Sequence, residues 1–355
     1  MCIRDRTRPG TRPATRAKAG AYYFDGWSGQ TDDLHLPDRL KKEFADREPV
    51  WGWRDDSIEI VQQQIDLAAE HGLSFFAFDW YWPEGPDKRS PLNTGLDLYR
   101  RAANRKRLEF CLLVANAGGF RLFPTEWPAA CDAWLNLFRE PTYLTVGGKP
   151  LLIIFSHRDL RESLGGPAAV KKGFAQLRER AAAAGLGGVT IAACCLPGPE
   201  NGWVDLQTLA DEGYDVFTGY AHYGYFRRGD DMKQSFADLV AGHADIWDRF
   251  AAKDVRPYIP VVTTGWDPRP WQEPVKAAET RPYWLHYPDR TPSAVGTFVE
   301  NAVRWLDAHP KQATSERLIL LYAWNEYGEG GYLAPTRGDG DAYLRAVKSA
   351  LTPAQ

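Results

Sequence analysis

The chain has 355 residues, of which 44% are hydrophobic and 25% charged, and its formal net charge is −3. This length and composition are ordinary for a soluble globular protein and allow a core that needs neither disulfides nor metal. The small net charge argues against a nucleic-acid or polyanionic partner, and no apolar run reaches the length of a membrane span. None of these properties bears on the oligomeric state, which stays open.

Residues 1–20 form a basic, proline-containing segment that lacks the apolar core of a signal peptide. We predict that this segment is a disordered or non-native tail and that residues 21–355 form one catalytic domain. A signal peptide lost ahead of this tail would make the protein secreted or periplasmic, and the sequence itself leaves the compartment open.

Eight short apolar runs follow in chain order, separated mostly by segments with helical periodicity. Because the runs are apolar throughout rather than alternating, they are typical of strands that are covered on both faces. They span residues 21–27, 73–82, 109–116, 150–156, 189–195, 214–220, 258–267 and 318–325.

The segments between the runs read as amphipathic helices, most clearly over residues 57–71, 235–252 and 292–309. Asp56 and Glu59 predict a capping box for the first of these, and Thr291 followed by Pro292 predicts the start of the third. Eight alternations of strand and helix predict a single closed (β/α)8 TIM barrel. The alternative, an open doubly wound sheet, is disfavoured because no glycine-rich phosphate loop follows any run.

We find no sequence motif for binding a cofactor or a metal. The histidines do not fall at ligand spacing, and a G-x-S-x-G elbow is absent. The five cysteines are odd in number and match no zinc or redox spacing. We therefore expect no cofactor and no metal, and we expect the cysteines within apolar runs, Cys111, Cys194 and Cys195, to be buried free thiols.

The carboxyl ends of the runs are acidic, aromatic and amide-rich, in a chain with 14 Trp, 16 Tyr and 16 Phe. Barrel enzymes carry their chemistry at this end of the strands, and aromatic faces suit the apolar face of a sugar while polar neighbours bind its hydroxyls. We therefore predict a rim that binds an oligosaccharide or polysaccharide. Its members are Asp25, Trp27, Asp79, Trp80, Tyr81, Asn116, His222, Tyr223, Trp266, Asp267, Trp324, Asn325 and Tyr327.

Some rim positions invite a more specific expectation. Asp25, Asp79 and Asp267 fit two roles about equally, either as acceptors for substrate hydroxyls or as helix caps. Of the strand-end histidines, His222 is favoured over His157 because tyrosines flank it. The four tryptophans expected to line the cleft are Trp27, Trp80, Trp266 and Trp324.

The strongest local signal is WNEYGEGG, residues 324–331, directly after the last run. Glycosidic cleavage needs one group to protonate the leaving oxygen and another on the opposite side of the anomeric centre. Glu326 and Glu329, on a turn that glycines loosen, can point into one cleft, where their like charges would push their pKa values apart. An E-x-x-E pair alone is common and can be two solvated carboxylates, but its position after the eighth strand favours catalysis.

This closing segment, WNEYGEGGYLAP followed by GDGDAYLRAV, resembles the glycoside hydrolase family 99-like proteins, which include the bacterial WbsX-like proteins. It is more distantly similar to the family 71 α-1,3-glucanases. The segments AYYFDGW, REPVWGWRDDS and FDWYW add to a resemblance that spans about residues 21–349.

The resemblance implies a (β/α)8 barrel that acts on α-linked glycans, with family 99 itself cleaving α-mannosides internally. It implies that Glu326 assists the sugar 2-hydroxyl in attacking the anomeric carbon, and that Glu329 is the general acid and then the base. Asn325 and Gly328 stand where family 99 has histidine, so the sugar and the retaining outcome stay open.

Three functions remain to be compared. The first is an α-glycoside hydrolase of mannoside or glucan type. The second is a glycosyltransferase of surface-polysaccharide synthesis, as WbsX-like proteins have been labelled, although the sequence has neither a D-x-D motif near a strand end nor a phosphate loop. The third is a non-catalytic carbohydrate-binding barrel, which would not need the two glutamates.

Overall fold

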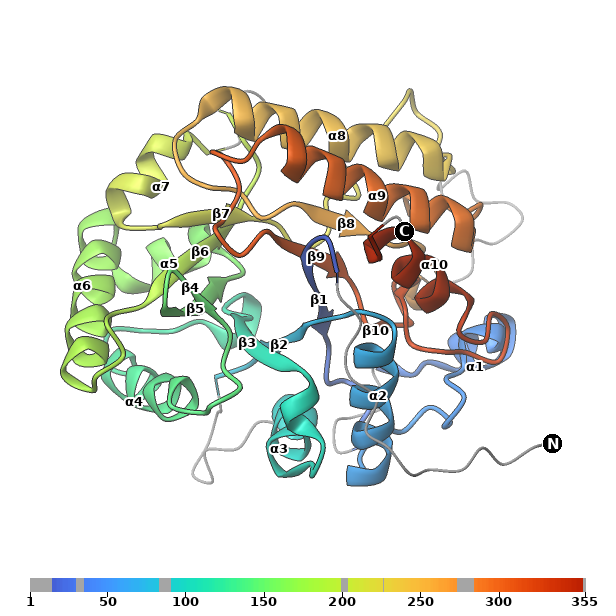
Figure 1. Ribbon diagram of the computed structural model, residues 1–355, viewed down its shortest axis with the longest axis horizontal. Helices are drawn as coiled ribbons and strands as arrows, with labels where there is room; N and C mark the ends of the chain where they lie inside the picture. The colour runs from blue at the N-terminus through green and yellow to red at the C-terminus, as the bar shows by residue number, and fades with distance from the viewer. Residues whose placement is uncertain are drawn as a thin grey trace.

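The computed structural model describes residues 15–29, 35–82, 91–198, 204–225, 227–272 and 284–353. Its centre is a barrel of parallel strands inside a ring of helices (Figure 1). The barrel strands are β1 (Lys18–Tyr23), β2 (Phe75–Trp80), β3 (Glu109–Val114), β5 (Lys149–Ile154), β6 (Thr190–Cys194), β7 (Val216–Thr218), β8 (Val261–Thr263) and β9 (Leu318–Tyr322).

The strands pair in the order β7-β6-β5-β3-β2-β1-β9-β8. A parallel bridge between Phe217 of β7 and Tyr258, just before β8, joins the two ends of this sheet. The short β4 (Thr145–Val146) pairs antiparallel with β5 outside the barrel path. The predicted (β/α)8 barrel is therefore confirmed, and each of the eight apolar runs overlaps a barrel strand.

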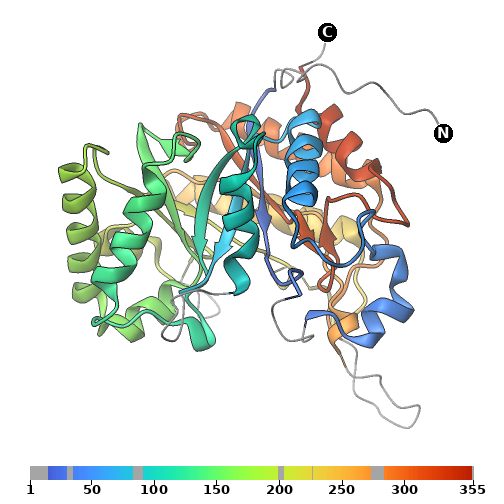
Figure 2. The same ribbon diagram turned by 90° about the horizontal axis from the view of Figure 1, so that it is seen from below.

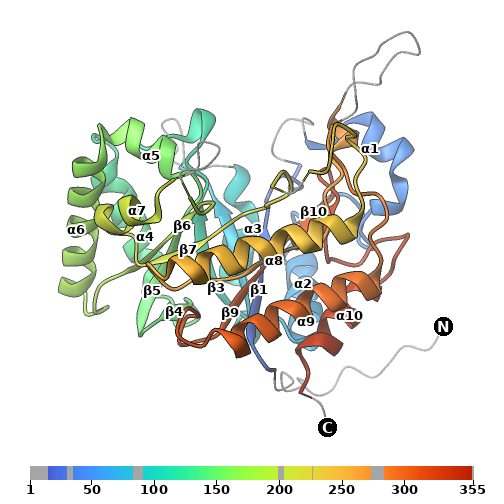
Figure 3. The same ribbon diagram turned by 90° about the horizontal axis from the view of Figure 1, so that it is seen from above.

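The helices pack around the outside of the strands, because each carries one apolar face (Figures 1 and 3). They are α2 (Ile58–Glu70), α3 (Thr94–Arg101), α4 (Trp127–Phe138), α5 (His157–Leu164), α6 (Pro167–Ala183), α7 (Leu206–Glu212), α8 (Phe236–Lys253), α9 (Pro292–Ala308) and α10 (Ala342–Leu351). The short α1 (Asp38–Glu43) lies at the end of the barrel toward which the strands point (Figures 2 and 3). Single 3-10 turns cover Ala45–Arg47, Pro91–Asn93, Arg105–Arg107, Gly118–Phe120 and Arg269–Trp271.

Local signals at helix starts were read correctly in one case and incorrectly in another. Thr291 is the N-cap of α9, where its side chain accepts from the backbone N–H of Ala294 and Pro292 is the first helical residue. The N-cap of α2 is Ser57, which accepts from the N–H of Ile60, so the capping box predicted at Asp56 is wrong. A serine and an aspartate next to each other are equally good caps, and the start of the helix decides between them.

The predicted tail over residues 1–20 is wrong at its C-terminal end. β1 begins at Lys18, and Ala19 and Gly20 are buried within it. Arg16 pairs with Glu300 of α9, and Lys18 pairs with Glu109 at the start of β3. Arg16 and Lys18, which the sequence assigned to the tail, thus form ion pairs with acidic residues of the barrel domain. Residues 1–14 lie outside the described residues.

The strand interiors are buried on both faces, as the uniformly apolar runs predict. Every residue of β2, β6 and β9 is buried. Cys111, Cys194 and Cys195 are buried free thiols, which confirms that expectation, and burial raises the pKa of the Cys195 thiol well above its ordinary value. None of the helices in the described ranges has the length and apolar character needed to cross a membrane.

Candidate active site

The segment after β9 folds back as a small hairpin over the mouth of the barrel. Its two strands are β10 (Asn325–Glu326) and β11 (Gly331–Tyr332), which pair antiparallel. The glycines of this hairpin allow close packing: a Cβ on Gly328 would lie 2.4 Å from the ring of Trp271, and one on Gly331 would lie 2.5 Å from the ring of Tyr322. These glycines therefore press the turn against its neighbours rather than loosen it, contrary to the expectation from sequence.

A single tyrosine joins two of the predicted carboxylates. The hydroxyl of Tyr220 lies 2.7 Å from Asp79 Oδ2 at the end of β2 and 2.7 Å from Glu326 Oε1. A phenol has one proton to donate, so at any moment only one of the two carboxylates can accept it. The other carboxyl group must then itself hold a proton if it is to complete the second hydrogen bond.

The charges around this tyrosine favour that extra proton. Burial raises the pKa of Asp79 well above its ordinary value, and the negative charge of Glu329 raises it further. Burial likewise raises the pKa of Glu326, to which Glu329 and then Asp79 add. Three carboxyl groups that share a dry site cannot all ionise near neutral pH, and this is the arrangement that general acid–base chemistry requires.

Glu329 differs from the other two because it borders an open pocket. Burial raises the pKa of its carboxyl group to about 7, while a hydrogen bond from Tyr322 opposes the shift. The pocket holds about 540 Å³ and is lined by Phe155, His157, Arg158, Cys194, Cys195, Leu196, Val204, Gly219, Tyr220, Ala221, His222, Tyr223, Trp266 and Glu329.

The pocket wall carries one aromatic platform. The rings of Tyr223 and Trp266 are stacked at 3.6 Å between centroids and 2° between planes. Tyr223 is 37% exposed and meets solvent at the rim, whereas Trp266 is 8% exposed. Of the four tryptophans expected in the cleft, Trp266 is the one that lines this pocket.

The other three tryptophans face away from the pocket, and the expectation that they line the cleft is wrong. Trp324 donates its indole N–H to Gln64 of α2, Trp80 packs against Trp134 of α4, and Trp27 donates to the backbone oxygen of Asn325. All three are at most 5% exposed. Successive residues of a strand point to opposite sides, so Trp80 faces the helix layer when its neighbour Asp79 faces the barrel.

The two rim asparagines hold strand ends together. The amide of Asn116 bonds both the backbone N–H and the backbone oxygen belonging to Ser156. Asn325 does the same with the backbone of Phe24, and thereby joins the hairpin to the end of β1. The carbonyl and amide groups expected to face a substrate are therefore already engaged in the barrel itself.

Of three further polar rim residues, Asp25 supports a helix end, whereas His222 and Tyr81 lie at the site. Asp25 accepts from the N–H of Gly95 at the start of α3, so it supports a helix end rather than facing the pocket. Burial lowers the pKa of His222 to about 3, and this neutral ring lines the pocket. Burial and then the charges of Asp79 and Glu326 raise the pKa of Tyr81, whose half-buried side chain therefore lies close to the carboxylates.

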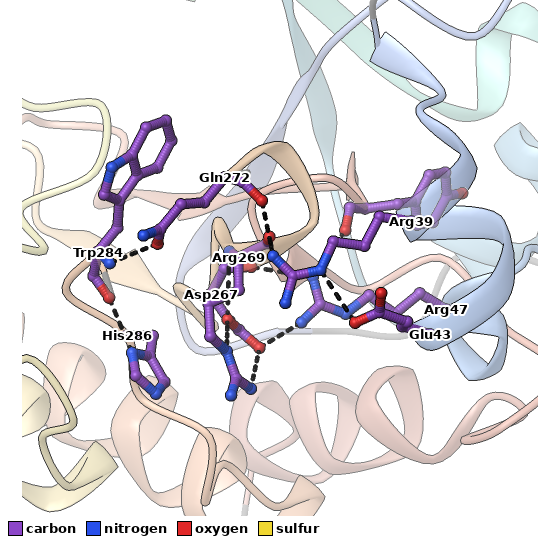
Figure 4. Close-up of polar contacts among 9 residues, drawn as sticks. Arg39, Glu43, Arg47, Asp267, Arg269, Gln272, Trp284 and His286 are labelled. Carbon is purple, nitrogen blue, oxygen red and sulfur yellow. Dashed lines mark hydrogen bonds and ion pairs between the residues drawn. The ribbon is translucent and has the colours of Figure 1, made fainter. Parts of the chain in front are cut away.

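Asp267 and Tyr327 are not free to meet a sugar. Both carboxylate oxygens of Asp267 are occupied, one by Arg47 and both by Arg269 (Figure 4). Burial acts to raise the pKa of Asp267, but hydrogen bonds from Arg269 and the charge of Arg47 leave it below its ordinary value. The buried ring of Tyr327 packs against Trp27 and Trp53.

Sequence reasoning assigned no role to three residues of this site. Tyr220 and Tyr322 contact the carboxylates directly, and Arg47 binds the hairpin. The two tyrosines fall at or beside the ends of predicted strands, where their position was a usable signal. Within the described residues, no group of three or more potential metal ligands comes together, and the absence of a metal stays a prediction.

The model of the family described as Glycosyltransferase WbsX matches residues 53–347. The chain belongs to this family. Two strains of Xanthomonas campestris pv. campestris carry curated relatives of this WbsX-family chain, each named uncharacterized protein WxcX and 25% identical over 317 residues. The match covers 83% of the chain and 42% of the relative, so the chain spans less than half the length of these relatives.

Solved structures similar to this WbsX-family chain are glycoside hydrolase folds. One is a glycoside hydrolase-like protein with 14% identity and a TM-score of 0.62, over 99% of this chain and 98% of that one. Another is the GH99 endo-alpha-mannosidase from Bacteroides thetaiotaomicron, with 16% identity and a TM-score of 0.61, over 93% and 95% of the two chains. At such identities the likeness shows the fold alone.

Proposed function

We propose that this protein is a glycoside hydrolase that cleaves α-linked glycans, of mannoside or glucan type, at the pocket beside Glu329. The observation that carries the proposal is the half-buried carboxyl group of Glu329, which accepts from Tyr322 on the wall of a 540 Å³ pocket; desolvation there raises its pKa to about 7. Such a group is protonated often enough near neutral pH to act as a general acid and is basic enough to recover the proton.

The proposed reaction divides the work between the two glutamates. Glu329 donates a proton to the leaving glycosidic oxygen as its bond to the anomeric carbon breaks. Glu326 takes the proton of the 2-hydroxyl, whose oxygen attacks the anomeric carbon and gives an anhydro sugar; water then opens this ring with Glu329 as the base. This assignment follows the resemblance to family 99; it places the proton shared through Tyr220 on Asp79, which leaves Glu326 ionised to act as the base.

The substrate is proposed to lie along the pocket wall. Tyr223, which is stacked on Trp266 and is 37% exposed, offers an aromatic surface to the apolar side of a sugar, and Tyr81 lies near the carboxylates. Neutral His222 suits hydroxyl groups better than an anion. Trp27, Trp80, Trp324, Asn116, Asn325 and Tyr327 then act as supports of the site rather than as contacts to the sugar.

A glycosyltransferase is the competing function, because the family carries that description. A nucleotide-sugar donor brings two phosphates, whereas the pocket lining contains one arginine, Arg158, beside the carboxyl group of Glu329. Hydrolysis needs only water and a neutral glycan, which this lining suits better than two phosphates.

The test is a screen of the purified protein against α-linked mannose and glucose oligosaccharides, with nucleotide sugars plus acceptor glycans in parallel. We expect shorter oligosaccharides to be released from one α-linked series, and we expect a Glu326→Gln, Glu329→Gln double variant to release none. Transfer from a nucleotide sugar without hydrolysis of any glycan would overturn the proposal.

A further inference from the structure

A buried arginine from the segment after α1 reaches the turn that carries the two glutamates. Arg47 is 8% exposed, and its guanidinium lies 4.4 Å from the centre of the Phe44 ring. Its Nη1 donates to the backbone oxygens of Asp267 and Tyr327, each at 3.0 Å, and its Nη2 donates to Asp267 Oδ2 at 2.5 Å. Figure 4 shows the guanidinium of Arg47 reaching the carboxylate of Asp267.

Asp267 also contacts the turn between Glu326 and Glu329. Its backbone N–H donates to the backbone oxygen of Glu329 at 2.5 Å. A Cβ on Gly330 would lie 2.9 Å from this nitrogen and 3.3 Å from Arg47 Nη1, so the turn rests directly on both residues. Arg47 and Asp267 therefore hold backbone oxygens on either side of Gly328, those of Tyr327 and Glu329.

We propose that Arg47 and Asp267 are positioning residues that fix the Glu326–Glu329 turn and keep the Glu329 carboxyl group dry. The inference rests on the proposed function for its kinetic consequences, and its structural part stands without it. A guanidinium is suited to this task because its fixed fork of donors meets one carboxylate and two backbone oxygens at once. A lysine at the same position can satisfy fewer of these acceptors.

The position of a reacting group strongly affects rate, since a displacement of about 1 Å can cost about 100-fold. We expect Arg47→Met to lower kcat by about 10- to 100-fold with little change in KM, because the pocket wall that holds the glycan stays in place. A looser turn admits water, so the pKa of Glu329 should fall from about 7 toward its ordinary value. An acid must be protonated to work, so the basic limb of the rate profile should move to lower pH.

The matched control is Arg178→Met. Arg178 also binds one carboxylate, Asp215, and backbone oxygens, including that of Gly213, but it does so just before β7, at the opposite end of the barrel from the site. We expect this variant to lose thermal stability while kcat per folded molecule and the pH profile stay as in the wild type. Arg47→Lys should fold and show a smaller loss of kcat in the same direction.

Carboxyl ¹³C NMR of glutamate-labelled protein separates this inference from the proposed function. The Glu329 signal is assigned by its loss in Glu329→Gln and is then titrated in the wild type, Arg47→Lys and Arg47→Met. A lower pKa of Glu329 in the Arg47 variants supports the positioning role even if no glycan is cleaved, in which case only the proposed function fails. An unchanged pKa, or an unchanged kcat and pH profile in an active enzyme, overturns it.

Discussion

At the scale of single residues, the site consists of three carboxyl groups whose hydrogen bonds come from two tyrosine hydroxyls. Tyr220 bonds both Asp79 and Glu326, and Tyr322 bonds Glu329. The two tyrosine rings lie 4.8 Å apart between centroids, so the two hydrogen-bonded groups are packed against each other. This coupling is the physical basis for giving the two glutamates different protonation states.

Asp55 is another buried carboxyl group, outside the lining of the pocket. It accepts from Tyr23 at 3.4 Å, and burial raises its pKa to about 7. A folded-state pKa above the unfolded value of 3.8 means that folding holds the proton, so stability is full below about pH 4 and falls as the pH rises toward 7. Asp55 therefore lowers the stability of the fold at neutral pH.

We expect Asp55→Asn to remove this loss, because the amide cannot ionise. Relative to the wild type, its free energy of unfolding should rise with pH by up to about 1.4 kcal/mol per unit between about pH 4 and 7. Urea titrations at pH 5 and pH 8 measure it, and the comparison cancels the opposite trend from histidines such as His157, whose pKa burial lowers to about 4. Asp230→Asn, at a fully exposed side chain, is the control; a difference that does not change with pH would contradict the prediction.

The residue scale also shows where sequence reasoning stops. It placed Glu326, Glu329, Asp79 and Trp266 at the strand ends, but it assigned neighbouring residues to the rim without deciding which side of the strand each one faces. Trp80 follows Asp79 directly, and alternation along the strand sends their side chains to opposite faces. One partner of Asp267, Arg47, comes from 220 positions earlier in the chain, and no local pattern predicts such a contact.

At the scale of elements, the hairpin β10–β11 is what turns a strand end into a site. Its shape depends on glycines at positions where a side chain has no room. Gly328 lies against the ring of Trp271, which belongs to the 3-10 turn after β8. The element is therefore fixed by contacts from the neighbouring loop as well as by its own two strands.

We expect Gly328→Ala to lower the free energy of unfolding by about 1–3 kcal/mol, the usual cost of an added methyl group in a packed site. Activity should fall as well, because the turn must shift away from Trp271. Gly119→Ala is the matched control, since a Cβ at Gly119 meets nothing within 4 Å in the turn after β3. Urea denaturation of both variants measures the effect, and equal stabilities would show that the turn is not confined as described.

At the scale of the whole molecule, the sequence predicts the architecture better than the site. Eight uniformly apolar runs require burial on both faces, and a closed parallel barrel provides it for every strand. The start of the barrel was placed three residues late because Arg16 and Lys18 look like tail residues, whereas both form ion pairs with distant acidic residues. Periodicity predicts the layers, but it does not identify charged residues that pair across the fold.

We propose that Glu329 protonates the leaving group and that Glu326 assists the 2-hydroxyl. A general acid matters in proportion to how poorly the leaving group departs without a proton. Glu329→Gln should therefore lose about 10²–10⁴-fold in kcat/KM on a natural glycan and much less on an activated aryl or fluoride glycoside. Glu326→Gln should lose activity on both, because the step that it assists is required whatever the leaving group.

The decisive measurement is kcat/KM for both variants on both substrate types, each relative to the wild type. We expect the loss of kcat/KM to depend on the leaving group in the Glu329 variant alone. The same dependence in the Glu326 variant instead would exchange the two roles. If both variants keep the activity of the wild type, Glu326 and Glu329 are not the catalytic residues.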